Sequence, residues 1–131
     1  MIAQYTRQYQ QTQILTSSGV QLVVLLYDAA IQSIELARRG IETNNIPDKG
    51  RFLGRAISIV GELNSVLDFE RGGEIARSLH RIYDYVLTEL VSANARNKTH
   101  HLDGPVRCLT TLREAWVEVA ARQKAPVGAG R

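Results

Sequence analysis

The sequence predicts an all-α protein, an antiparallel up-down-up-down four-helix bundle with a flexible N-terminal arm. Four segments carry apolar residues at a period near 3.6, which is typical of amphipathic helices. The joints between them are short, so consecutive helices run side by side in opposite directions. No segment alternates like a strand, and aromatic residues make up only 6% of the chain. One core shared by four helices is therefore expected.

The first predicted helix covers residues 18–41. Thr16, Ser17 or Ser18 can cap its start, because each side chain can accept a hydrogen bond from a free backbone N–H. Its core-facing stripe is expected to comprise Val23, Leu26, Tyr27, Ala30, Ile34, Ala37 and Ile41.

The second predicted helix covers residues 48–69 and starts at the Pro47-Asp48 pair. The third covers residues 73–97. The expected core stripes are Leu53, Ala56, Ile57, Val60, Leu63 and Leu67 on the second, and Ile75, Leu79, Ile82, Tyr83, Val86, Leu90 and Ala93 on the third.

The fourth predicted helix covers residues 103–122. Asp103 caps it, and Pro105 is acceptable because the first turn has no partner for its missing N–H. Its expected stripe comprises Val106, Leu109, Leu112, Trp116 and Val119.

These helices divide the chain into three parts. Residues 1–15 are the predicted arm, residues 16–122 the bundle, and residues 123–131 a tail expected to be disordered.

The joint between the second and third helices contains a Gly72-Gly73 pair. Either glycine can adopt a positive φ and end the second helix. We expect Asp68, Glu70 and Glu74 to hold this turn through charge-assisted bonds to backbone N–H groups.

Composition argues against several functional classes. The net charge is only +3, and both signs are interspersed, which is unlike the basic stripe of a nucleic-acid binder. Cys108 is the only cysteine, so no disulfide framework is expected. The polar N-terminal residues lack the apolar core of a secretory signal, and the most apolar run is too short for a membrane span. A cytosolic protein without membrane insertion is expected.

No catalytic or metal-binding motif is found. A di-iron site in a helical bundle requires Glu-x-x-His on two helices, and the residues three before His80, His100 and His101 are not glutamates. The sequence also lacks phosphate-binding, nucleophile-elbow and zinc-protease motifs. We expect no enzyme, no metal and no cofactor.

One apolar row exceeds what the core requires. It lies on the first helix about 140° from the core stripe, so it predicts a second hydrophobic surface. Residues of the second helix extend this surface. The row comprises Leu22, Leu25, Ala29 and Leu36, and the extension comprises Phe52, Ile59 and Val66.

Two occupants of this surface remain open. The arm, with Tyr9 and Ile14 among its apolar residues, can fold back over it as a lid. Alternatively, the surface is a groove for an amphipathic partner. Both hold if the partner displaces the lid. The row can equally serve a homo-oligomer, so the sequence leaves the oligomeric state open.

Four stretches resemble the FliS family of flagellar secretion chaperones. TSSGVQLVVLLYDAAI is similar to the family's first-helix signature, and ELNSVLDFERGGEIARSLHRIYDYV to its central stretch. TLREAWVEV matches its closing motif, and YQQTQILT agrees with its arm. The stretches occur in the family's order over about residues 5–120.

The resemblance implies an antiparallel bundle that acts as a cytosolic export chaperone. Such proteins bind the disordered C-terminal segment of flagellin, prevent its premature polymerisation and deliver it to the flagellar type III export apparatus. The family's arm covers part of that surface in the free protein. The alternative is a bundle adaptor for another amphipathic partner, such as a flagellar regulator. Other export proteins remain possible partners.

The apolar row and the resemblance together suggest roles for individual residues. Leu22, Leu25, Ala29, Leu36, Ile59 and Val66 are the expected partner-binding wall, with Tyr9 and Ile14 in the lid or its contact. Tyr27 and Asp28 match the family's Tyr-Asp pair. We expect the Tyr27 ring to be structural, and Asp28 to orient either a neighbouring helix or the partner's backbone.

Overall fold

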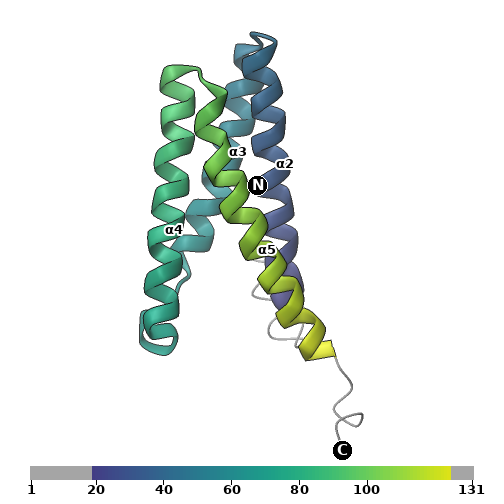
Figure 1. Cartoon of the computed structure of the whole chain (residues 1–131), viewed down its shortest axis with the longest axis vertical. Helices are drawn as coiled ribbons and strands as arrows, with labels where there is room; N and C mark the ends of the chain where they lie inside the picture. Colours follow the sequence, from purple (N-terminus) through teal and green to yellow (C-terminus); the bar gives the residue numbers. More distant parts are fainter. Residues whose placement is uncertain (1–18, 125–131) are drawn as a thin grey trace, which may run out of the picture.

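The computed structural model describes residues 19–124, which form an antiparallel four-helix bundle (Figure 1). The all-α prediction is therefore confirmed. Residues 1–18 and 125–131, which include the predicted arm, lie outside the described part. The elements are α2 (Gly19–Glu42), α3 (Ile46–Ser65), α4 (Phe69–Arg96), the short 3-10 helix η1 (Thr99–Leu102) and α5 (Asp103–Lys124).

The four helices are not packed equally along their lengths. The α2 helix packs against α3 on one side and α5 on the other, and α4 packs against α3. The helices α4 and α5 meet beside η1 and diverge towards the opposite end (Figure 1). The bundle is thus closed at the η1 end and open at the other.

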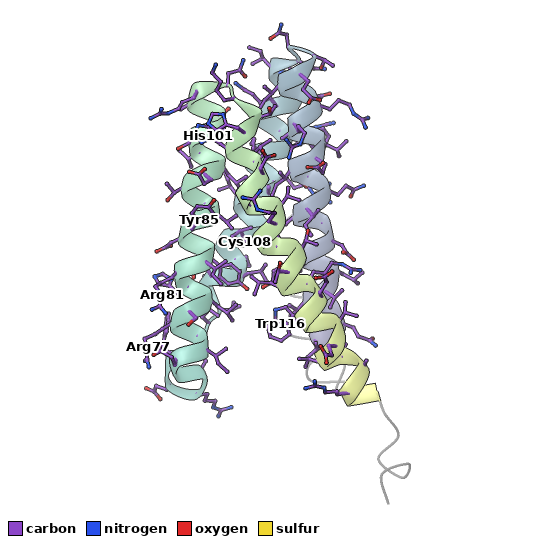
Figure 2. The ribbon with its side chains drawn as sticks, viewed as in Figure 1. Arg77, Arg81, Tyr85, His101, Cys108 and Trp116 are labelled. Atoms are coloured by element: carbon purple, nitrogen blue, oxygen red, sulfur yellow. The ribbon has the colours of Figure 1, made fainter. Side chains whose placement is uncertain are left out.

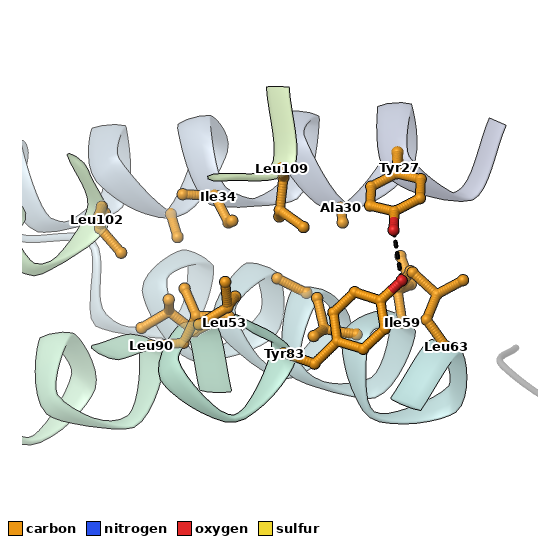
Figure 3. Close-up of a cluster of buried hydrophobic side chains, with 14 of the residues drawn as sticks. Tyr27, Ala30, Ile34, Leu53, Ile59, Leu63, Tyr83, Leu90, Leu102 and Leu109 are labelled. Atoms are coloured by element: carbon orange, nitrogen blue, oxygen red, sulfur yellow. Dashed lines mark hydrogen bonds between the residues drawn. The ribbon is translucent and has the colours of Figure 1, made fainter. Parts of the chain in front are cut away.

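Buried apolar side chains from all four long helices form one continuous core (Figure 3). All seven residues of the predicted α2 stripe are buried, because their spacing places them on one face. They interdigitate with buried residues of the other helices. Fully or almost fully buried side chains include Ile34, Leu53, Val60, Val86, Leu90, Leu102 and Leu109.

The joint between α2 and α3 is a tight helix stop. The N–H of Asn45 donates a hydrogen bond to the carbonyl of Gly40 at 2.8 Å, and the N–H of Asn44 donates one to the carbonyl of Ile41 at 3.3 Å. Asn44 adopts a positive φ of 56°, which is typical of a helix C-terminus. The Asn45 side chain then caps α3 by accepting from the N–H of Asp48 at 3.1 Å. A Cβ on Gly40 would lie 2.8 Å from the nitrogen of Lys49, so only glycine permits this approach.

The joint between α3 and α4 differs from the prediction. Helix α3 ends at Ser65 rather than near residue 69, because the Asp68 carboxylate accepts the N–H groups of Glu70 and Arg71 and starts α4 there. Gly73 does adopt a positive φ, but it bends the start of α4 (φ 51°, ψ −124°) instead of ending α3. Gly72 is part of the first α4 turn.

The expectation that no segment is apolar enough for a membrane span needs correction. The α2 helix has sufficient length and hydropathy to cross a membrane. This is weak evidence for a span, since the core helix of a bundle meets the same criterion. Here α2 buries ten residues against its neighbours, which accounts for its apolar composition.

Candidate binding cleft

The open end of the bundle contains an apolar cleft with a volume of about 340 Å³. All four long helices contribute to its walls. Most of the lining is hydrocarbon, with three charged residues among the lining side chains. The lining residues are Val23, Leu26, Glu62, Leu63, Val66, Leu67, Asp68, Arg71, Gly72, Ile75, Ala76, Leu79, Tyr83 and Trp116.

The cleft exists because α4 and α5 separate before their apolar stripes end. Ile75, which the periodicity assigned to the core, is 73% exposed. Leu79 on α4, and Leu112 and Trp116 on α5, are only partly buried against the core. Figure 2 shows Trp116 on the α5 side of the gap between the two helices. The surplus apolar surface thus lies between α4 and α5, because these stripes have no partner there.

Two aromatic residues, Tyr83 and Trp116, line the cleft, and the buried Tyr27 joins them from beneath. The Tyr27 hydroxyl is hydrogen-bonded to the Tyr83 hydroxyl of α4 (Figure 3) and accepts from the Trp116 indole N–H of α5 at 3.2 Å. Tyr27 is fully buried, and burial raises the pKa of its phenol, although the two hydrogen bonds partly oppose the shift. The Tyr27 hydroxyl therefore stays neutral and links three helices.

An ion pair outside the lining of the cleft joins α5 to α2. Asp28 of α2 accepts from the Arg113 Nε of α5, and the Arg113 Nη2 lies 3.5 Å from the other carboxylate oxygen. This hydrogen bond raises the pKa of the Arg113 guanidinium above its ordinary value. Asp28 thus contacts a neighbouring helix, one of the two roles that the sequence left open.

Polar groups at the mouth of the cleft belong to the joint before α4. The Arg71 Nε atom lies 3.8 Å from the Asp68 Oδ2 atom. Glu62 belongs to the preceding helix, α3, and also lines the cleft. Glu74 does not bind backbone N–H groups as predicted. Its carboxylate instead pairs with Arg77 at 3.0 Å and with Arg81 at 3.6 Å, which lie about one and two helical turns later on α4.

Apart from Ile59, the predicted partner-binding residues fall into three groups in the structure. Val66 lines the cleft. Leu22, Leu25, Ala29 and Leu36 do not line it; Leu25 is 59% exposed, while the other three are partly buried. Tyr9 and Ile14 lie outside the described residues.

The assignment of Ile59 to an exposed flank was wrong. Ile59 is 1% exposed and belongs to the core. It lies three residues after Ala56 and four before Leu63, so it shares their inward face. The partly buried Phe52 packs against this core and carries the Arg51 guanidinium 4.5 Å above its ring.

The sequence did not identify most of the cleft. Ile75, Leu79 and Tyr83 recur every four residues, so the row itself was visible as a helical stripe. Its exposure was not visible, because periodicity does not report the angle at which two helices diverge.

The cleft can bind apolar groups, and its residue types offer no evident catalysis. Within residues 19–124, no three His, Cys, Asp or Glu side chains are grouped so that they could hold a metal ion. The titratable side chains in the lining of the cleft are Glu62, Asp68, Arg71 and Tyr83.

Comparisons with known proteins agree with one another. The family model described as "Flagellar protein FliS" matches residues 1–123. The chain is 38% identical to the flagellar secretion chaperone FliSB of Pseudomonas aeruginosa, over 84% of this chain and 90% of that protein. It is 32% identical to the flagellar secretion chaperones FliS of Salmonella typhimurium (92% and 90% covered) and Bacillus subtilis (88% and 86% covered).

Proposed function

The chain belongs to the FliS family of flagellar secretion chaperones, which are not enzymes, and from this premise we propose that its cleft binds the disordered C-terminal segment of flagellin in the cytosol. Binding prevents premature polymerisation of flagellin. The bound complex delivers flagellin to the flagellar type III export apparatus. The single observation that supports this proposal most is the apolar cleft at the open end of a bundle that is otherwise closed.

The physical basis is substitute burial. A segment that polymerises with other flagellin molecules exposes an apolar face before assembly. The cleft has apolar walls from four helices that can cover that face. A disordered segment that orders on binding buries on the order of 1,000–3,000 Å² and loses conformational entropy. This entropy loss keeps the affinity finite, so release at export remains feasible.

A charge placed on the cleft wall tests the proposal. Ile75 is 73% exposed in the cleft, so Ile75→Asp is expected to leave the bundle folded. In the complex the new carboxylate would be desolvated, and we expect an affinity loss of at least about tenfold. The measurement is isothermal titration calorimetry of the chain with a flagellin C-terminal peptide.

Two control variants locate the site. Val91→Asp places the same charge on α4 at a 56% exposed residue that does not line the cleft, and it should bind like the wild type. Leu25→Asp tests the apolar row on α2 that the sequence favoured. If Leu25→Asp abolishes binding and Ile75→Asp does not, the site is the α2 row rather than the cleft. Absence of heat with any flagellin peptide would instead support an adaptor for another amphipathic partner.

A further inference from the structure

We propose that Tyr27 and Asp28 act together as a latch that holds the distal half of α5 against α2 and thereby keeps the cleft open. These residues are positioning residues for the binding reaction, because each acts through α5. The proposal rests on the proposed function for its effect on partner binding, but its structural part does not. It joins two separate sequence stretches, LLYDAA on α2 and LREAW on α5.

The two contacts match residue for residue. Tyr27 binds Trp116, and the adjacent Asp28 binds Arg113, one turn earlier on α5. Trp116 lies where α5 has diverged from α4 (Figure 2), and the Asp28–Arg113 contact is one turn earlier on α5. The position of this half of α5 is therefore set by contacts to α2, both these polar contacts and the packing of Leu112 and Trp116 on the core, rather than by packing against α4.

Tyr27 also fixes the opposite wall. Its hydroxyl bonds to Tyr83 of α4 while it accepts from Trp116 of α5, so a single buried oxygen lies between the two walls of the cleft. Apolar walls with no occupant favour collapse, because closure would remove Ile75 and Leu79 from water. The latch opposes that collapse by directional bonds: loss of the Tyr27 contacts would leave a buried hydroxyl without partners, whereas the Asp28–Arg113 pair is partly exposed and acts by fixing the position of α5.

The latch predicts a measurable change in helix spacing. Spin labels at Arg77 of α4 and Arg122 of α5, which are exposed, would report the distance across the open end in a Cys108→Ser background. Double electron–electron resonance on the free protein should give one narrow distribution. In Tyr27→Phe and in Asp28→Asn, we expect the mean distance to shorten and the distribution to broaden.

Binding supplies the second readout. Removal of one latch contact should weaken binding of the flagellin C-terminal peptide by about two- to tenfold, since the partner must reopen the collapsed cleft. Tyr85→Phe is the matched control. It removes a tyrosine hydroxyl that lies against Gly104 away from the cleft, and it should change neither readout.

The outcomes separate the latch from the proposed function. An unchanged distance distribution in both Tyr27→Phe and Asp28→Asn overturns the latch, whatever the peptide does. A shortened distance with unchanged peptide affinity overturns its link to the cleft. If the wild type does not bind the peptide, the proposed function fails, and the distance measurement still decides the latch. Circular dichroism should show the same helix content in every variant. If Tyr27→Phe does not fold, the distance distribution of Asp28→Asn alone tests the latch.

Discussion

Replacing Gly73 with alanine should destabilise the bundle, although the residue has open space around it. A Cβ built on Gly73 meets no atom within 4 Å, so steric packing predicts a neutral substitution. The backbone predicts otherwise. At φ 51° and ψ −124°, Gly73 has the dihedral angles of the first central position of a type II′ turn, which L-residues rarely adopt.

The magnitude follows from this conformation. Holding an L-residue in such a region costs about 1–3 kcal/mol. Gly54→Ala is a matched control, because its Cβ also meets no atom within 4 Å but its backbone is helical. That variant should gain about 0.5–1 kcal/mol, since alanine loses less backbone entropy in a helix than glycine. The same chemical change should thus have opposite signs at two open positions.

Urea unfolding followed by circular dichroism measures both changes. We expect the midpoint to fall for Gly73→Ala and to rise for Gly54→Ala at constant slope, because the surface exposed on unfolding is unchanged. A Gly73→Ala variant as stable as the wild type would show that the bend before residue 74 is not fixed. The account of the α3–α4 joint would then be wrong.

Two further predictions concern stability. Asp68→Ala should cost about 1 kcal/mol in urea unfolding, because the N–H groups of Glu70 and Arg71 lose their acceptor; an unchanged midpoint would contradict the cap. The Tyr27 phenol should ionise above the ordinary tyrosine pKa of 10.0. Its contribution to the free energy of unfolding is therefore complete below pH 10.0 and is lost as the pH rises through the higher pKa of the folded state. Spectrophotometric titration should show this delayed phase in the wild type, and its persistence in Tyr27→Phe would refute the assignment.

Much of the fold could be predicted because helical periodicity is a local property. Residues of the α2 stripe such as Ala30 and Ile34 were placed correctly in the core from spacing alone. The joint before α4 was misplaced because two signals compete there. Asp68 is a strong signal for a helix start, and the Gly72-Gly73 pair is a strong signal for a helix end. The sequence alone did not show that α4 begins at the Asp68 cap and continues through the two glycines.

The cleft was harder to predict because it depends on the relative placement of helices. Ile75 and Ile59 illustrate the two errors. Ile75 lies on a core stripe but is exposed, because α5 turns away from α4. Ile59 was assigned to an outer flank but is buried, because α2 and α3 pack closely. The exposure of Ile75 follows from tertiary contacts that one helix does not encode, whereas the inward face of Ile59 was visible in its spacing from Ala56 and Leu63.

The most direct test of the central claim is a methyl NMR titration of the isotope-labelled chain with a flagellin C-terminal peptide. If the peptide fills the cleft, the methyl signals of Val66, Ile75 and Leu79 should shift first and most, while those of Leu25 and Leu36 on the α2 row change little. Large shifts confined to Leu25 and Leu36, with Ile75 and Leu79 unmoved, would contradict binding in the cleft.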